Sequence, residues 1–316
     1  MFKFIIKRIL HAIPLLLIIS VISFFIIQLA PGSPVNMFIN PEVASPIDVE
    51  MVKKNLGLDK PIYVQYLIWL KNVLKGDFGT SFLHSRPVME LIMERLPNTL
   101  ILALVATIIS FLIAIPSGII SAIKRNSAYD YAFSTLSFIG VSLPSFWFGL
   151  MLILLFSLKL RLLPSGGMRS NFDEFVLSDR LVHLILPSAV LAMGSMASKM
   201  RYMRSSMLEV INQDYIRTAR SKGLSERIVI YKHALRNALL PIITMLGLII
   251  PGLFSGAVIT ETIFSWPGLG RLAVEATFMR DYPVIMGVTM FSSALVVIGS
   301  LIADILYAIV DPRIKY

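Results

Sequence analysis

The residues that could do chemistry in this chain are few and scattered. Its four histidines are far apart in the sequence, it has no cysteine, and its acidic residues show no HExxH or paired-carboxylate spacing. It also lacks the Gly-x-x-x-x-Gly-Lys-[Ser/Thr] loop that holds nucleotide phosphates. The sequence therefore predicts no catalytic residue, no metal site, no cofactor site and no ATPase site, so we expect the chain not to be an enzyme.

The densest charge lies in one segment, Asp214–Pro241, with the sequence DYIRTARSKGLSERIVIYKHALRNALLP. Residues 210–220 have helical spacing, which places Tyr215 and Ala219 on one face. Gly223 can take the left-handed conformation that ends a helix, and Ser225 is placed to cap a second short helix that runs to His233. Two helices joined at a glycine predict a rigid lever that projects from the rest of the protein and transmits rigid-body motion.

The elements around this segment are predicted to cross a membrane. Hydrophobic residues make up 56% of the 316 residues, and the mean hydropathy is +0.77, above that of an ordinary soluble domain. A helix needs about 20 mostly apolar residues to span the hydrocarbon layer. Six windows qualify: Ile9–Leu29, Asn98–Ala122, Ala132–Leu158, Leu184–Met203, Leu239–Thr260 and Val284–Val310. The first is expected to be a retained anchor, because its apolar run ends in Ala-Pro-Gly-Ser-Pro instead of a cleavage site.

The charge of the loops predicts the orientation. Six spans put both termini on one side, and that side carries 16 of the 29 Lys and Arg but only 6 of the 19 Asp and Glu. The opposite side carries 13 of each sign, so its net charge is zero. Because basic residues near span ends are retained in the cytoplasm, both termini and the 207–236 loop are expected there. Nucleic-acid binding is not expected of such a polytopic protein.

Three regions follow from this reading. Residues 1–94 hold the first span, about 9–29, and an extracytoplasmic insert. Residues 95–304 form a core of five spans with the loop of about 207–238, and residues 305–316 form the end of the last span and a cytoplasmic tail. In the insert, one short helix is expected to end at Gly57 and another to run from Pro61 to Gly76. Its use as a lid or docking surface and its use as a packing element both stay open.

Several residues inside or beside the spans are candidates for a function. Asp304 is an acid within the last span, and it either serves function or pairs with a basic residue near the surface. Prolines and glycines interrupt the spans, which fits close packing as well as a permeation path. An adaptable lining of that path could come from Phe146, Trp147, Met193 and Met196. Lipid-facing or core packing is the alternative for each of these four.

The basic segment resembles the EAA loop of ATP-binding-cassette (ABC) importer permeases of the oligopeptide/dipeptide branch. The general motif is Glu-Ala-Ala-x-x-x-Gly; here Arg217, Thr218, Ala219 and Gly223 stand at the corresponding positions, in the form DYIRTARxKGL that this branch uses. Four more stretches are similar to that branch's subunit with a large first external loop: GLDKPIYVQYLIWLKNVLKGDFGTSF, ERLPNTL, IFSWPGLG and LIADILYAIVDPRIKY.

This resemblance implies an all-α polytopic membrane protein of six transmembrane helices with the type I ABC importer (MetI-like) permease fold. It implies a permease subunit for oligopeptides or dipeptides in the cell membrane of a prokaryote, working by alternating access, with ATP and Mg bound by partner subunits. The implied partners are a homologous second permease subunit, two cytoplasmic ABC ATPase subunits and an extracytoplasmic substrate-binding protein, besides the peptide and membrane lipid.

The resemblance also implies site residues. The ATPase contact is expected at Asp214, Tyr215, Arg217, Thr218, Ala219, Lys222 and Gly223. Trp266 and Pro267, in the external segment Ile263–Gly270, are candidates for contact with the binding protein; an aromatic anchor at the membrane surface is the alternative for Trp266.

Other functions stay open as alternatives. The same permease role could serve nickel chelates, glutathione or oligosaccharides, which close relatives in this branch handle. An ion-coupled secondary transporter would need buried acids or histidines for its ion, and the spans offer Asp304 and little else. A membrane-embedded enzyme would need a catalytic cluster, which the sequence lacks.

Overall fold

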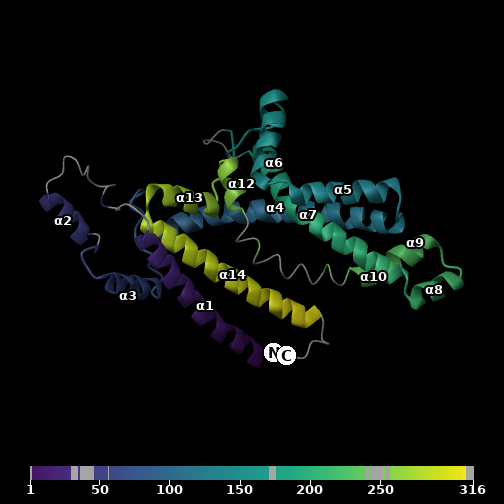
Figure 1. Ribbon diagram of the computed structural model, residues 1–316, viewed down its shortest axis with the longest axis horizontal. Coiled ribbons are helices and arrows are strands. Elements are labelled where there is room, and N and C mark those ends of the chain that lie inside the picture. The colour runs from purple at the N-terminus through teal and green to yellow at the C-terminus, as the bar shows by residue number, and fades with distance from the viewer. Residues whose placement is uncertain are drawn as a thin grey trace. The chain divides into compact units, whose positions relative to one another are not determined.

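The computed structural model describes residues 2–29, 35, 46–55, 57–170, 176–239, 242, 252 and 257–310. Within these residues the regular structure is helical, apart from one isolated bridge between Thr80 and Pro87. The chain divides into two compact units, and Figure 1 shows the helices of both. The first unit holds Met1–Asn98 and Pro267–Ile298, and the second holds Thr99–Trp266 and Gly299–Tyr316.

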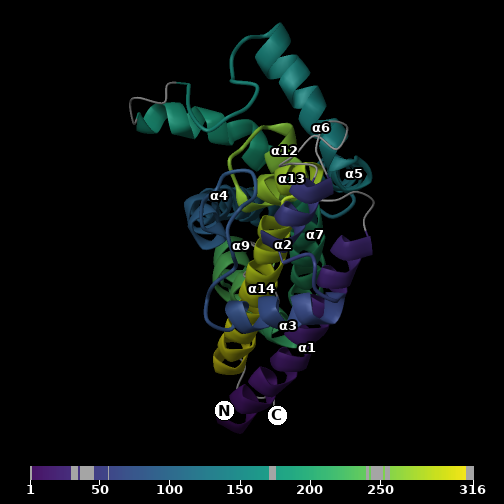
Figure 2. The ribbon, with the colours of Figure 1, turned by 90° about the vertical axis from the view of Figure 1, so that its left-hand side faces the viewer.

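The first unit contains two long apolar helices, α1 (Phe2–Leu29) and most of α14 (Tyr282–Val310), with the shorter α2 (Pro46–Asn55), α3 (Ile62–Val73) and α13 (Leu269–Met279). The amphipathic helix α3 lies beside α1, as Figure 2 shows. The hydroxyls of Ser20 and Tyr66 lie 2.9 Å apart, and the Gln28 amide donates to the Gln65 carbonyl over 3.2 Å. As predicted, α3 begins after Pro61 and ends shortly before Gly76.

The start of α4 (Val88–Ile123) belongs to the core of the first unit. Residues 88–96 continue without a break into the long apolar helix, although Glu90, Glu94 and Arg95 interrupt their apolar pattern. Val88 and Ile92 are fully buried and pack with Leu269, Leu272 and other apolar residues of α13 and α14. The interrupting charges Glu90 and Glu94 lie on the opposite, exposed face, where both pair with Arg86.

The turn at residues 81–83 of the insert is held by a buried acid. Asp281 is 1% exposed, and its carboxylate accepts hydrogen bonds from the Ser81 hydroxyl at 2.5 Å and from the backbone N–H groups of Phe82 and Leu83, both at 3.1 Å. These partners lie about 200 positions away in the sequence. The carboxylate therefore joins the end of the insert to the start of α14.

We predict that Asp281→Ala lowers the free energy of unfolding by about 3 kcal/mol, because three donors lose a charged acceptor in a buried place. Thermal unfolding of the purified protein and proteolysis within the insert measure the effect. Glu94→Gln is the matched control, because Glu94 is exposed and forms only a surface ion pair. Equal unfolding temperatures for the two variants would contradict the anchoring role.

The second unit is built on α7 (Leu177–Ile211), which packs along α5 (Ala128–Ser142) and α6 (Ser145–Leu152). The rest of α4 reaches the same core, where Leu102 contacts Leu184 and Trp266. Beyond α6 the chain forms the π-helix η2 (Ile153–Lys159). The short helix α12 (Val258–Ile263) packs on α6 and α7.

Four described helices are long and apolar enough to cross a membrane: Ile6–Leu29, Val88–Ile123, Leu177–Ile211 and Tyr282–Ile305. The window Ala132–Leu158, expected to be one span, is two helical segments bent by 105°. The break falls at Leu143 and Pro144, where proline offers no N–H and forces the preceding residue into an extended conformation. Counted as one broken span, this pair raises the number to five. Most of the window Leu239–Thr260 lies outside the described residues.

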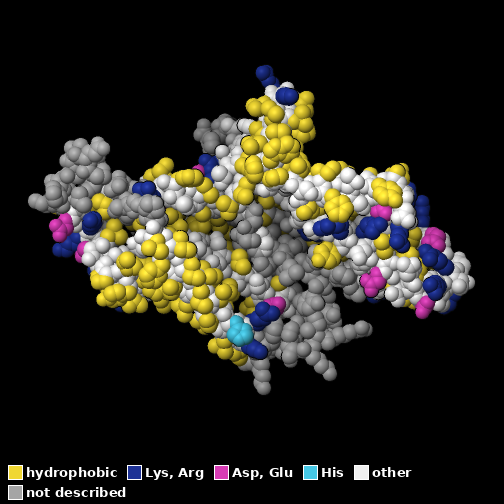
Figure 3. Space-filling model, viewed as in Figure 1, with side chains coloured by type: hydrophobic (Ala, Val, Ile, Leu, Met, Phe, Trp, Pro, Cys, Tyr) yellow, Lys and Arg dark blue, Asp and Glu magenta, His cyan; other side chains and the backbone are white. Residues whose placement is uncertain are grey.

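The surface of these helices fits a lipid environment. In α1, side chains such as Leu10, Ile18 and Ile26 are more than half exposed, and Figure 3 shows apolar side chains gathered over this helix. In the second unit, the same figure shows Lys and Arg gathered at the end that carries the segment after α7. The two kinds of surface are what the hydropathy and charge patterns predict.

Candidate functional site: the segment after α7

The predicted lever is present in the structure. Helix α7 ends at Ile211, α8 spans Asp214–Ser221, and the chain reverses at Gly223, whose φ of +74° lies in the left-handed region. Glycine takes this conformation without the steric cost that a side chain brings. A second helical stretch follows, made of α9 (Glu226–Ile228), the π-helix η3 (Val229–Ala234) and α10 (Leu235–Ala238). Ser225 precedes α9, as expected, but its side chain makes no capping hydrogen bond.

The lever has two arms, α8 and the stretch from α9 to α10, which pack tightly on each other and on α7. Ile216 and Ala219 of α8 are buried with Met207 of α7 and with Val229 and Ala234 of η3. The helical spacing predicted that Tyr215 and Ala219 share one face; in the structure Ile216 is buried beside Ala219, and Tyr215 is 43% exposed. The reason is the helical period, since positions 216 and 219 are neighbours on one face as well. The lever is thus a small packed domain instead of a loose loop.

Hydrogen bonds and an ion pair on the surface join the two arms of the lever. The Asn237 amide donates to the Tyr215 hydroxyl over 2.8 Å, which links the end of the second arm to the start of the first. Arg220 and Glu226 pair across the glycine turn at 2.8 Å. Thr218 donates to the carbonyl of Asp214 within α8. Such exposed contacts are weak one by one, but together they fix the angle between the arms.

Six of the seven residues predicted to touch an ATPase are exposed, and they share the surface of α8 and the turn. They are Asp214, Tyr215, Arg217, Thr218, Lys222 and Gly223. Ala219 is 6% exposed and packs inside the lever, so its contribution is to let the arms approach closely. The structure thus brings the predicted set together on α8 and the turn that follows it, with Ala219 as the exception that faces inward.

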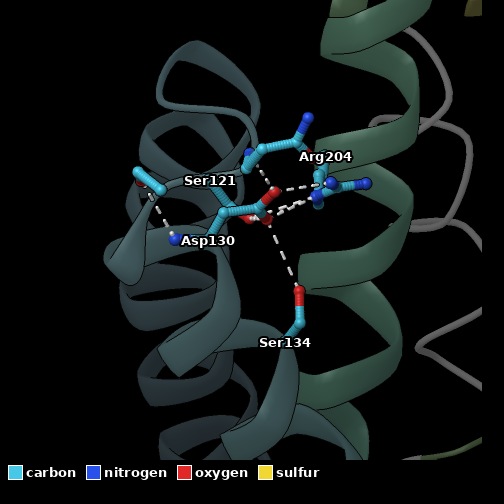
Figure 4. Close-up of polar contacts among 6 residues, drawn as sticks. Ser121, Asp130, Ser134 and Arg204 are labelled. Atoms are coloured by element: carbon cyan, nitrogen blue, oxygen red, sulfur yellow. Dashed lines mark hydrogen bonds and ion pairs between the residues drawn. The ribbon is translucent and has the colours of Figure 1, made fainter.

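An ion pair that was not predicted from the sequence lies near the C-terminal end of α7, shortly before the lever begins. Arg204 of α7 donates two hydrogen bonds to the Asp130 carboxylate of α5, from Nε and Nη2, each over 2.7 Å (Figure 4). Asp130 is 3% exposed, and it also accepts hydrogen bonds from the Ser121 hydroxyl of α4 and the Asn126 backbone N–H. This cluster therefore ties three helices at one point.

The signal for this pair was present but ambiguous. Asp130 follows a helix-capping Ser127 by three positions, and Arg204 lies among many basic residues near the end of a span. Charge counting assigned both to the same side of the membrane, yet it could not pair residues 74 positions apart. A bidentate arginine–carboxylate pair is also the strongest geometry open to such side chains.

Lys199, about one and a half helical turns before Arg204 on α7, is a second cation whose burial was not predicted from the sequence. It is 8% exposed, donates to the hydroxyls of Ser110 at 2.6 Å and Ser195 at 3.0 Å, and lies 4.6 Å from the Phe111 ring centroid. These contacts solvate the ammonium group inside the helix bundle. The sequence reading counted Lys199 as a loop residue, whereas the structure buries it between α4 and α7.

The four candidates for a translocation path all lie in the second unit. Phe146 and Trp147, which follow the break at Pro144, are 50% and 44% exposed. Met193 of α7 packs against Gly140 of α5, where an added Cβ would lie 3.3 Å from its side chain. Met196 is half-buried on the same helix. A shared lining by these residues stays a prediction.

The segment IFSWPGLG forms a packed turn. Trp266 is 1% exposed, in a cluster with Leu102 and Leu184, and Phe264 is fully buried beside Leu186 and Val190. The burial of the indole argues against its direct contact with another protein and against its role as a membrane-surface anchor, because both need an accessible ring. Pro267 is half-exposed.

Asp304 is half-buried on α14, and its function stays a prediction. Among the described residues, no three His, Asp or Glu side chains are grouped closely enough to hold a metal ion.

Comparison with known proteins identifies the family. A family model for the inner membrane component of binding-protein-dependent transport systems matches residues 114–316, and a model for the N-terminal part of such components matches residues 1–103. The first match contains the lever and the Asp130–Arg204 pair, and the second contains α1 and α3.

Individual relatives agree along the full length. The chain is 54% identical to the oligopeptide transport system permease protein AppB of Bacillus subtilis, and each chain is covered completely. It is 41% identical to the dipeptide transport system permease protein DppB of Alkalihalophilus pseudofirmus, again over 100% of both chains. A putative peptide permease protein of Brucella suis is 44% identical over 100% of this chain and 99% of its own.

A solved structure has the same fold. The chain resembles an inward-facing form of the MetNI methionine ABC transporter with a TM-score of 0.56 at 19% identity, over 72% of this chain and 98% of the other. With both family models and the full-length relatives in agreement, this helical, multi-pass chain belongs to the inner-membrane permease components of binding-protein-dependent transport systems.

Proposed function

We propose that the chain is one of two permease subunits in an ATP-driven importer of short peptides. It works with a homologous second permease, two ABC ATPases and an extracytoplasmic substrate-binding protein, and it moves peptide by alternating access. The ATPases hold ATP and Mg. The names of the full-length relatives support peptides as the substrate class, since these are an oligopeptide permease and a dipeptide permease.

The observation that carries this proposal is the lever. Its buried face, around Ile216 and Ala219, fixes it to α7, while Arg217, Thr218 and Lys222 are exposed to a partner. Rigid-body motion of an ATPase seated on α8 can therefore reach the helix bundle without being lost in a flexible loop. The positive charge of this end supports its cytoplasmic placement, together with both termini.

The same proposal assigns two further surfaces. Phe146, Trp147, Met193 and Met196 line part of the translocation path, where aromatic and thioether side chains tolerate varied peptide side chains. Pro267, half-exposed next to the buried Trp266, contributes to the contact with the binding protein.

Reconstitution tests the proposed function. Proteoliposomes with both permeases, both ATPases and the binding protein are expected to accumulate a labelled dipeptide only with ATP, and vanadate is expected to stop uptake. An ionophore that collapses ion gradients is expected to have no effect. Uptake by the permeases without ATPases, or loss of uptake with the ionophore alone, would identify an ion-coupled transporter instead.

A further inference from the structure

The first unit contains a pocket that the transport function does not account for. Its volume is about 250 Å³, and it lies among α1, α3, the loop after α3 and the start of α14. Its walls are mainly aromatic and apolar, with Phe24, Trp69, Phe78, Phe82 and Met286 among the lining residues. We call this cavity the α3 pocket.

Contacts among the lining residues hold the α3 pocket in shape. The Gln65 amide donates to the carbonyl of Lys60 over 2.8 Å, and its own carbonyl accepts from Gln28 of α1. The rings of Phe24 and Trp69 lie 6.2 Å apart, and Phe24 is itself 7% exposed. A pocket whose walls are fixed in this way costs little ordering entropy when a ligand binds.

Trp69, one of the lining residues, has a hydrogen-bond donor without an acceptor. The indole N–H of Trp69 is buried, and no acceptor for it lies among the described residues. Leaving such a donor buried and unpaired costs about 1–3 kcal/mol, so buried indole N–H groups usually have a partner. A ligand whose carbonyl oxygen reaches this N–H would recover this energy.

Two charges of opposite sign belong to the exposed part of the lining. Lys60 and Asp77 are both exposed, and neither forms an ion pair within the described part of the chain. One oxygen of Asp77 accepts from the backbone N–H of Gly79, which leaves the other for a ligand. An exposed cation together with an exposed anion complements a zwitterion better than a molecule of one charge.

The size limits the ligand further. Pockets for drug-sized ligands usually measure about 300–1,000 Å³, so a cavity of about 250 Å³ holds something smaller. A dipeptide with one apolar side chain fits the size, the aromatic walls, the donor and the two charges together. An oligosaccharide or a long peptide does not.

We propose that the α3 pocket is a binding site for a short zwitterionic peptide with an apolar side chain. The Trp69 N–H donates to a peptide carbonyl, Asp77 pairs with the terminal amine, and Lys60 pairs with the terminal carboxylate. The apolar side chain lies among the rings. This inference rests on the proposed peptide import, and it adds a permease site on the extracytoplasmic insert where peptide is held outside the translocation path.

Equilibrium binding of the dipeptide Ala-Phe tests the site. The assembly of permeases and ATPases is placed in lipid nanodiscs without the binding protein, and binding is followed by isothermal titration calorimetry. Trp69→Phe keeps the ring and removes the donor, so we expect Ala-Phe to bind about three- to tenfold more weakly. Tyr63→Phe is the control, because Tyr63 lies on the same helix, is 65% exposed and does not line the pocket.

Blocked peptides test the two charges separately. Asp77→Asn is expected to weaken binding of free Ala-Phe but not of its N-acetylated form, and Lys60→Gln to weaken binding of free Ala-Phe but not of its amidated form. Both side chains are exposed, so these variants report on the site even if Trp69→Phe disturbs folding. The proposal is overturned if Ala-Phe binds equally to the wild type and all three variants, or if the blocked peptides lose as much affinity as the free one.

Two further results separate the causes of failure. If the heat of Ala-Phe binding depends on the nanodisc lipid and is lost when zwitterionic lipid is present, lipid is the natural occupant and the peptide site is rejected. Dipeptide uptake by the complete system with its binding protein tests the proposed function on its own. Wild-type uptake without Ala-Phe binding to the permeases would overturn the α3 pocket site alone.

Discussion

Replacement of Gly223 by proline is expected to reduce ATP-driven uptake at least tenfold while the protein still inserts into the membrane. Gly223 has a φ of +74°, whereas the proline ring holds φ near −65°. Its backbone N–H also donates to the carbonyl of Arg220 over 2.9 Å, and proline has no such donor. The turn between α8 and α9 must therefore open, and the exposed face of α8 loses its fixed orientation.

ATP hydrolysis and uptake measured on the same proteoliposomes check this expectation. Hydrolysis should continue while uptake falls, because the ATPase subunits are unchanged and only the transmission of their motion is lost. Gly223→Ala is the matched control. An added Cβ would have no neighbour within 4 Å, so alanine brings no clash and costs only the left-handed backbone, about 1–2 kcal/mol. It should reduce uptake far less than proline, and normal uptake in the proline variant would rule out the lever.

The sequence predicted the lever well, because its signals are local. A helical period, a glycine that ends it and a second helical stretch are set by neighbouring residues, and the structure places them at α8, Gly223 and α9. What the sequence could not decide is which side of α8 faces inward. Tyr215 and Ile216 are both apolar enough to be buried, and only the packing against Val229 and Met207 selects Ile216.

Other differences come from contacts between distant residues. Asp281 with Ser81 and Arg204 with Asp130 are pairs that hydropathy and charge counting cannot identify. Trp266 was expected to be accessible because its short segment was placed outside the membrane, yet the ring fills a space between α4 and α7. The proline at 144 was visible as a break, but the 105° bend it permits depends on how α6 packs on α7 and α12.

The second large effect is expected when the Asp130–Arg204 ion pair, near the end of α7, is broken. Arg204→Met is expected to lower the free energy of unfolding by about 3 kcal/mol, because it leaves the Asp130 carboxylate buried without its cation. The Ser121 hydroxyl and the Asn126 N–H remain as donors to that carboxylate, but they carry no charge. Arg204→Lys should recover only part of the loss, since an ammonium group cannot form the two parallel hydrogen bonds of the guanidinium.

A double-mutant cycle with Asp130→Asn measures the pair itself. If the two groups stabilise the fold through each other, the double variant Asp130→Asn with Arg204→Met should lose clearly less unfolding free energy than the sum of the losses in the two single variants. Thermal unfolding followed by tryptophan fluorescence gives the values. Removal of the exposed pair Arg86–Glu90 by Glu90→Gln is the control and should have a much smaller effect.

This cycle also decides whether the pair contributes to coupling. The Asp130–Arg204 cluster joins α4, α5 and α7, and α7 leads directly into the lever. If the pair contributes to coupling, a push on α8 is expected to move the three helices together. Uptake per ATP hydrolysed, measured at a temperature where the single variants stay folded, should fall in Arg204→Met. If the stability losses are additive and uptake per ATP is unchanged, the ion pair does not contribute to coupling. In that case α7 transmits the motion without α4 and α5.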